Sequence, residues 1–283
     1  MSSLTETRPV PVAPARPAVI TRPARQWHRR ALRFSGNVFT RIAAIGALAL
    51  VWEILPRLGL VDAVFLPPLS EVLAAWWDLL VSGELWSHTS ASLGRSAAGF
   101  GLAVAIGVPL GLLIGWYRPV ANLLNSLLEV FRNTAALAIL PVFVLILGLG
   151  ETSKVAIIFY GCTWPILLNT VSGVRTVDPL LIKSARSLDL SPVRLFQKVV
   201  LPAAVPTIFT GIRLAGAASI LILIAAEMVG AKAGLGYLIN YAQFNFAVPD
   251  MYAGIITISA IGLLVNQLLV VIERRFSTWR THS

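Results

Sequence analysis

The stretch VAIIFYGCTWPILLNTVSGV, Val155 to Val174, contains no charged residue and is long enough to cross a lipid bilayer as a helix. A hydrocarbon core about 30 Å thick needs roughly 20 apolar residues in helical conformation. Two further charge-free stretches have this length, at 97–117 and 251–272. We therefore expect three transmembrane helices from these stretches alone.

The composition excludes a soluble fold for the chain as a whole. Of 283 residues, 57% are hydrophobic and only 13% are charged, whereas soluble domains carry about 25% charged residues. A solvated globule of this size would lack the ionic surface that it needs, while hydrocarbon can replace a polar shell. The composition predicts one all-α, polytopic membrane unit.

Three weaker apolar stretches complete a set of six. They are 38–58, 120–149, which contains Glu129 and Arg132, and 203–227, which has Arg213 near its start. We therefore predict six transmembrane helices, the last five within a core at 89–273. Gly107, Gly111 and Gly115 recur every fourth residue in the second span and predict close packing against another helix, either in this chain or in another copy.

The basic residues predict the orientation of the spans. With a cytoplasmic N-terminus, 17 of the 23 Lys and Arg residues lie inside, and only Arg57, Arg95, Lys154 and Lys232 lie outside. Positive charge in short loops marks the cytoplasmic side. Both termini are expected to be cytoplasmic, with a Pro- and Arg-rich tail at 1–37 and a second tail at 274–283. The basic excess behind the net charge of +10 falls mainly in the first tail, and we expect these charges to contact anionic membrane lipid rather than nucleic acid.

The outer segment at 59–88 contains a helix-like repeat of apolar residues from Leu69 to Leu80. Trp76, Trp77 and Trp86 are amphipathic rings of the kind found at membrane interfaces. The pattern predicts a helix at 69–83, either lying on the outer surface or packed on the bundle, with Ser70 as its N-cap.

The cytoplasmic loop at 175–202 is organised rather than irregular. Asp178-Pro179 and Ser191-Pro192 each pair an N-cap residue with proline at the first helical position. Two short helices are expected, at 179–188 and 192–200. Because the first mixes leucines with Lys183 and Arg186, it predicts a docking surface for a cytoplasmic partner.

The same loop resembles the cytoplasmic signature of permease subunits of bacterial ABC importers. The resemblance rests on KSARSLD (Lys183 to Asp189) and VVLP (Val199 to Pro202) at the spacing of that family. Elsewhere, similarity to the sulfonate, taurine and nitrate branch is seen at GLGETSK (148–154), Trp164-Pro165, Asn169, LPAAVP (201–206), Glu227 and GLG (234–236). Together these cover about residues 60–275.

The resemblance implies a type I ABC importer permease fold in a bacterial inner membrane. It implies a second permease copy, two ATPase subunits that bind ATP and Mg, and an extracytoplasmic solute-binding protein. The loop would dock on the ATPase through Leu180, Leu181, Lys183, Ser184, Ala185, Leu188, Asp189 and Leu190. Three of these depart from the family pattern: Lys183 replaces Glu, Ser184 replaces Ala and Asp189 replaces Gly.

No catalytic or cofactor-binding motif of the chain's own is apparent. The fragment at 148–154 has Ser and Lys in the wrong order for a phosphate-binding loop. The three histidines lie far apart, so no metal site is expected. The chain is predicted not to be an enzyme, with ATP hydrolysis by a partner subunit.

Polar residues inside spans are candidates for the translocation pathway, because burying them in hydrocarbon is costly. They are Arg132, Asn133, Asn169 and Glu227. Arg132 either pairs with Glu129 or attracts an anionic substrate; Asn169 either bonds a neighbouring helix or lines the pathway; Glu227 is either a gate or an interface residue. The family suggests a small anion, and an ion-coupled secondary transporter and a non-transporting membrane scaffold remain the alternatives.

Overall fold

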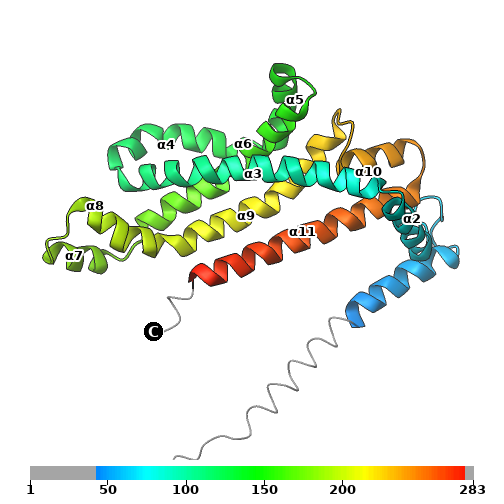
Figure 1. Cartoon of the computed structure of the whole chain (residues 1–283), viewed down its shortest axis with the longest axis horizontal. Coiled ribbons are helices and arrows are strands. Elements are labelled where there is room, and N and C mark those ends of the chain that lie inside the picture. The colour runs from blue at the N-terminus through cyan, green and yellow to red at the C-terminus, as the bar shows by residue number, and fades with distance from the viewer. Residues whose placement is uncertain (1–42, 278–283) are drawn as a thin grey trace, which may run out of the picture. The chain divides into compact units, whose positions relative to one another are not determined.

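The computed structural model describes residues 43–277 of the chain (Figure 1). The chain divides into two units, Met1–Trp52 and Glu53–Ser283. In the first, the described residues, 43–52, are helical. The expected tail at 1–37 and the start of the expected span at 38–58 lie outside the described residues, as does the end of the C-terminal tail.

The second unit is helical throughout its described regular structure, which confirms the all-α prediction. After helical residues 53–57, its helices are α2 (Leu69–Val81), α3 (Glu84–Trp116), α4 (Arg118–Asn133), α5 (Ala136–Leu147), α6 (Glu151–Arg175), α7 (Pro179–Ser187), α8 (Pro192–Leu195), α9 (Leu201–Met228), α10 (Leu235–Phe244) and α11 (Val248–Ser277). A π-helical turn, Phe196–Val200, joins α8 to α9 without a break.

Four helical segments within 43–277 are long and apolar enough to cross a membrane. They are Glu84–Trp116, Glu151–Arg175, Pro192–Met228 and Val248–Arg275. Each contains one of the apolar stretches expected from the sequence. On α11, Leu264 and Leu263 are 69% and 66% exposed, as expected for side chains that face lipid.

The span predicted at 120–149 is not one continuous helix. α4 ends at Asn133 and α5 begins at Ala136, with Thr134 and Ala135 in extended conformation between them. Asn and Thr favour such breaks because their side chains compete for backbone hydrogen bonds. Here Thr134 Oγ1 donates to the Val130 carbonyl at 2.9 Å. The two pieces, of 16 and 12 residues, are each too short to cross a bilayer alone.

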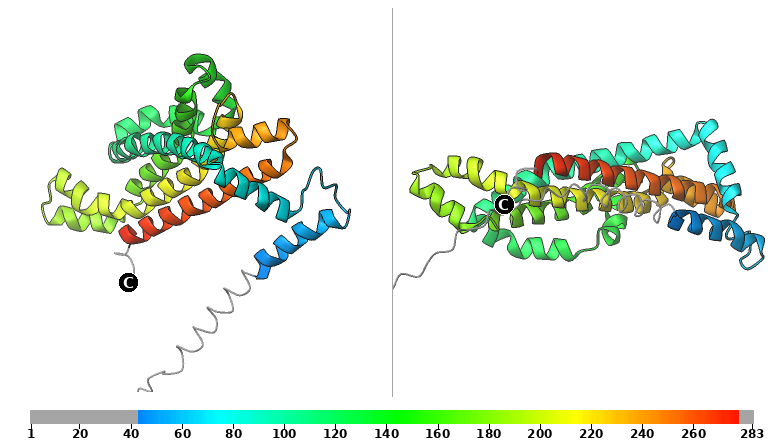
Figure 2. Two further views of the ribbon diagram at one scale, coloured as in Figure 1. Left: turned by 45° about the vertical axis from the view of Figure 1, so that its right-hand side comes forward. Right: turned by 90° about the horizontal axis from the view of Figure 1, so that it is seen from below.

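α6 lies at the centre of the bundle, between α3 and α9. Its side chains Ile157, Ile158, Cys162 and Ile166 are fully buried. α11 runs alongside α9 (Figures 1 and 2), while α7 and α8 lie at the opposite end of the unit from α2 and α10. We refer to these as the α7 end and the α10 end. Helices α3 and α6 begin toward the α10 end, and α9 ends there.

Glycines allow α3 to approach α6 closely. A methyl group added at Gly111 would lie 2.6 Å from Thr170 Cβ, and one added at Gly115 would lie 2.7 Å from Val174 Cβ. At Gly107 the corresponding distance, to Ile166 Cγ2, is 3.1 Å. The predicted close-packing face is confirmed, and its partner is α6 of the same chain.

α2 packs on the bundle through one of its tryptophans. Trp76 Nε1 donates to Thr257 Oγ1 of α11 at 3.0 Å, whereas Trp77 is 60% exposed. The prediction that Ser70 caps this helix is wrong, because the N-cap is Pro68. Ser70 is instead bonded by the Glu53 carboxylate, which accepts from its N–H and its hydroxyl, both at 2.9 Å.

α10 has no counterpart in the sequence prediction. It follows Gly234, whose φ of +124° is a conformation that residues with a side chain rarely adopt. Its buried residues are Leu235, Gly236, Leu238, Ile239 and Ala242. α10 therefore closes its end of the bundle as part of the core.

The glycine contacts yield a stability prediction. Gly111→Ala should destabilise the purified chain by about 1–3 kcal/mol, because the added methyl overlaps Thr170 in a packed interface. Gly101→Ala on the same helix meets nothing within 4 Å and should be neutral or slightly stabilising. Thermal unfolding in detergent compares the two variants, and equal melting temperatures would contradict the assigned α3–α6 contact.

Candidate functional site

The loop between α6 and α9 is ordered by the first predicted cap. Asp178 Oδ1 accepts a hydrogen bond from the Leu180 N–H at 2.8 Å, as the Asp-Pro pair predicts. α7 then ends at Ser187, and Asp189 takes a positive φ of 53°. Aspartate visits this left-handed region more readily than most residues, so the exchange of Gly for Asp is compatible with the turn.

The second predicted cap differs from the structure. Ser191 occupies the N-cap position of α8, but its side chain makes no capping hydrogen bond. α8 spans only Pro192–Leu195, and the π-helical turn carries the chain directly into α9. The segment expected as a separate helix at 192–200 is thus the first part of a long helical rod.

Most of the predicted docking residues lie on the surface of this loop. Leu180, Leu181 and Leu188 are 70%, 51% and 77% exposed, and Lys183 and Arg186 are exposed beside them. We call these five residues the α7 surface. Ser184 and Asp189 are also exposed, Leu190 is half-buried, and Ala185 is buried beneath the helix. The α7 surface is apolar and basic, with no acidic residue in α7 itself.

The loop is packed firmly against the spans that it joins. Val174 of α6 and Val200 and Ala204 at the start of the α9 rod share a buried cluster with Ile182 of α7 at its edge. Phe196 also packs edge-on against Trp116, at the end of α3, with ring centroids 5.1 Å apart. The loop is therefore attached to α6 and to the start of the α9 rod by packed side chains.

The break between α4 and α5 lies against α6. Phe131 stacks on Trp164 with ring centroids 5.8 Å apart and an interplanar angle of 5°. The Tyr160 hydroxyl donates to the Phe131 carbonyl at 3.2 Å. The indole N–H of Trp164 is buried and has no hydrogen-bond partner among the described residues. Sequence reasoning identified Trp164 only through the family resemblance.

The pathway candidates are not brought together into one site. Asn133 ends α4 beside the break and is exposed. Arg132 precedes it in α4. Asn169 Nδ2 donates to the Pro165 carbonyl of its own helix at 2.8 Å, and no hydrogen bond to another helix is found for this side chain among the described residues. Glu227 lies elsewhere, at the α10 end.

Glu227 is fully buried and joins three helices. Its carboxylate accepts from Ser92 Oγ at 2.8 Å and from Arg95 Nη1 at 2.7 Å, both on α3, and from the Gly236 N–H of α10 at 2.8 Å. Arg95 also donates to Glu151 of α6 at 2.7 Å and to the Ala233 carbonyl at 2.6 Å. We call Ser92, Arg95, Glu151 and Glu227 the Arg95 cluster.

Arg95 and Lys154 are among the predicted outer charges, outside the predicted spans at 97–117 and 155–174, but the helices begin earlier than those spans. Both lie in helices and are buried, at 6% and 2% exposure. Lys154 Nζ donates to the carbonyls of Leu149 and Gly150 at 2.9 and 3.1 Å. Glu227 could have indicated a buried cation from the sequence, because a carboxylate in an apolar span requires a partner of opposite charge. Among the described residues no group of three His, Cys, Asp or Glu side chains is placed to hold a metal ion.

Comparisons with known proteins agree with this architecture. Residues 107–278 match the family described as binding-protein-dependent transport system inner membrane component. The putative aliphatic sulfonates transport permease of Bacillus subtilis is 35% identical over 81% of this chain and 83% of its own length. The taurine transport system permease of Escherichia coli is 32% identical over 89% and 95%.

Solved structures show the same fold. An inward-facing structure of the MetNI methionine ABC transporter aligns with a TM-score of 0.58 and 18% identity, over 70% of this chain and 96% of that one. The chain is therefore a multi-pass membrane protein with the fold of an ABC transporter permease. It belongs to the family of binding-protein-dependent transport system inner membrane components.

The Arg95 cluster yields a second stability prediction. Glu227→Gln should destabilise the chain by about 3–5 kcal/mol, because it removes the fully buried partner of a buried guanidinium. Glu273→Gln is the matched control: it breaks the more exposed Arg213–Glu273 pair and should cost about 1 kcal/mol or less. Thermal unfolding of both variants in one detergent is the measurement, and a larger loss for Glu273→Gln would contradict the assignment.

Proposed function

We propose that the chain is the permease subunit of an ABC importer that moves a small solute carrying an anionic group, of the sulfonate, taurine or nitrate kind. Movement would occur by alternating access, coupled to ATP hydrolysis on a separate subunit. The observation that carries the proposal is the α7 surface. A rigid, capped helix with exposed leucines and two cations fits an apolar groove with acidic residues on another protein.

The proposed topology has six spans with both termini in the cytoplasm. In addition to the four apolar segments, the stretch at 38–58 is one proposed span, and α4 with α5 is the other. The 16 residues of α4 and the 12 residues of α5 amount to about 42 Å of helix, which is enough to cross a bilayer despite the break. Arg118, Arg175 and the basic residues of the α7 loop would then lie on the cytoplasmic side, as the positive-inside rule requires.

The proposed assembly contains two copies of this chain, two ATPase subunits that bind ATP and Mg, and an extracytoplasmic solute-binding protein in a bacterial cytoplasmic membrane. The α7 surface, together with Ser184, Ala185, Asp189 and Leu190, would be the contact with the ATPase. The relatives support the substrate class, because they include permeases named for the transport of aliphatic sulfonates, taurine and bicarbonate.

The proposed pathway runs past the break between α4 and α5. Discontinuous helices in transporters commonly place unpaired backbone groups beside the substrate near the bilayer midplane. Arg132 and Asn133 precede this break, and Asn169 lies farther along α6 from Trp164. Glu227 would act at the far end, where its bonds to three helices must adjust when that end opens.

Two alternatives make different demands on the chain. An ion-coupled secondary transporter needs intramembrane carboxylates that gain and lose a proton or ion. Glu227 is held by Arg95 at 2.7 Å, so Glu129 would have to serve this role. A non-transporting scaffold would leave the exposed α7 surface as a simple attachment site. The proposed function is therefore best tested by transport.

Transport in proteoliposomes decides among these functions. The full chain, reconstituted with its ATPase and binding protein, should accumulate a labelled sulfonate only when ATP and Mg are supplied to the ATPase side. Uptake driven by an ion gradient without the ATPase would favour the secondary transporter. Active ATPase without uptake of any tested anion would favour the scaffold.

A substitution on the α7 surface tests coupling. Leu188→Asp should reduce transport at least about tenfold, because it places a charge where a leucine worth about 1.5–3 kcal/mol of apolar contact is expected. Pro192→Gly should have the same direction of effect by loosening the loop. Leu60→Asp is the control, since Leu60 is 68% exposed but lies far from α7 in the sequence. Normal transport by both loop variants would refute the coupling role.

A further inference from the structure

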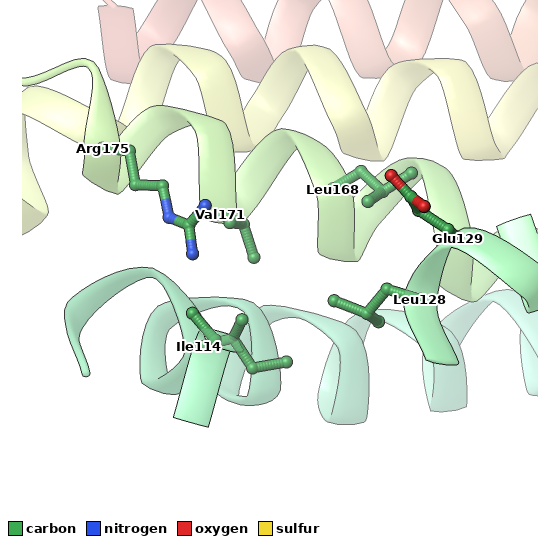
Figure 3. A pocket seen from close by; sticks show the side chains of 7 residues that line it. Ile114, Leu128, Glu129, Leu168, Val171 and Arg175 are labelled. Carbon is green, nitrogen blue, oxygen red and sulfur yellow. The ribbon is translucent and has the colours of Figure 1, made fainter. Parts of the chain in front are cut away.

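A pocket of about 130 Å³ lies between α3, α4 and α6. Figure 3 shows its lining, which is apolar except for one acidic and one basic side chain. The lining residues are Ile114, Ala121, Leu128, Glu129, Leu168, Val171 and Arg175. The volume is several times that of one water molecule, so the pocket has room for a small solute.

The two charges lie at opposite ends of the pocket. Glu129 lies beside Leu168, and Arg175 extends toward Ile114 from the last residue of α6 (Figure 3). Leu168 and Arg175 are seven residues apart, or about 10 Å along the helix axis. No ion pair joins Glu129 to Arg175, and neither pairs with another described side chain.

The chemistry of the lining defines what would fit. Glu129 and Arg175 are both exposed, so a solute can reach them, and an ammonium group would supply the charge opposite to the Glu129 carboxylate. A guanidinium binds sulfonate and carboxylate groups through two parallel hydrogen bonds. Between them, Leu128 and Val171 offer apolar contact to a short carbon chain.

We propose that this pocket binds a small zwitterion, with its ammonium group at Glu129 and its sulfonate or carboxylate group at Arg175. The inference rests on the proposed function, since it narrows the solute from any small anion to one that also carries an amine. A simple alkanesulfonate would gain Arg175 but meet repulsion from Glu129. The pocket therefore discriminates between amino sulfonates and plain sulfonates.

A zwitterionic lipid headgroup carries the same pair of charges, but the layout of the pocket favours a free solute. Arg175 is at the end of α6, whereas Glu129 lies opposite the interior of that helix. In the proposed topology, Glu129 is deeper in the membrane than Arg175. A phosphatidylethanolamine would then have to bury its ammonium group below its phosphate, against the order in a bilayer.

Binding of taurine, which is 2-aminoethanesulfonate, and of ethanesulfonate to the complete permease–ATPase complex in phosphatidylcholine nanodiscs tests the proposal. The native complex should bind taurine at least about tenfold more tightly than ethanesulfonate, an energy difference of about 1.4 kcal/mol. Glu129→Gln should abolish that preference, while Arg175→Gln should weaken binding of both. Arg118→Gln removes an exposed cation that does not line the pocket and should change neither.

Two results would overturn the inference. The first is that the native complex does not bind taurine, and the second is that the preference for taurine survives Glu129→Gln. Native mass spectrometry in nanodiscs that contain phosphatidylethanolamine adds the lipid arm: lipid retention lost in both variants, with taurine binding unchanged, would assign the pocket to lipid instead. Melting temperatures of the variants separate lost binding from lost folding.

The two proposals fail separately, because binding is measured without transport. ATP-dependent uptake with a taurine preference that does not depend on Glu129 would remove the pocket and leave the importer standing. Taurine binding that depends on both charges, without ATP-driven uptake, would support the pocket and contradict the importer.

Discussion

The close contact between α3 and α6 is the constraint on which the rest of the structure depends. Helices in lipid gain little from hydrophobic burial against one another, so dispersion contacts at short range carry much of their association. Gly111 and Gly115 bring the α3 backbone onto Thr170 and Val174 of α6. On another face of α6, Gly211 of α9 approaches Asn169 as closely. α6 is thereby fixed between two helices along its length. This also fixes the positions of the residues at its two ends.

The two ends of α6 carry the two features that matter most for the proposed transport cycle. At its first residue, Glu151 meets Arg95, which in turn holds Glu227 of α9. At its last turn, Val174 enters the cluster that supports α7 and the π-helical turn. The exposed carboxylate of Glu151 is more easily released than the buried one of Glu227, since water can replace Arg95 as its partner.

The sequence predicts the features that depend on local residue patterns. It does not predict the features that depend on contacts between residues far apart in the chain. Charge-free runs predict three of the four apolar helices, and a weaker apolar run that contains Arg213 predicts the fourth. The Asp178-Pro179 pair predicts the start of α7. These predictions succeed because hydropathy and capping act within a few residues. The Arg95 cluster joins residues 56 and 132 positions apart, so no local pattern distinguishes a buried Arg95 from a loop cation. The break at Thr134 is an intermediate case. Its residues weaken a helix, but the sequence does not fix the position of the turn. The extended backbone of Thr134 and Ala135 places it, next to the stack of Phe131 on Trp164.

The charged side chains of the bundle are of two kinds. Some pair with each other across helices, and others remain open to a ligand. Arg95 is met by Glu227, and Arg213 by Glu273 of α11 at 2.9 Å; each pair joins two helices and leaves little charge to attract a solute. Glu129 and Arg175 line one pocket without neutralising each other or pairing with any other described side chain. Direct pairing would have stabilised α4 against α6 but filled the space between them. The pocket thus carries one charge at each end, both on exposed side chains, and the proposed zwitterion would pair with both at once.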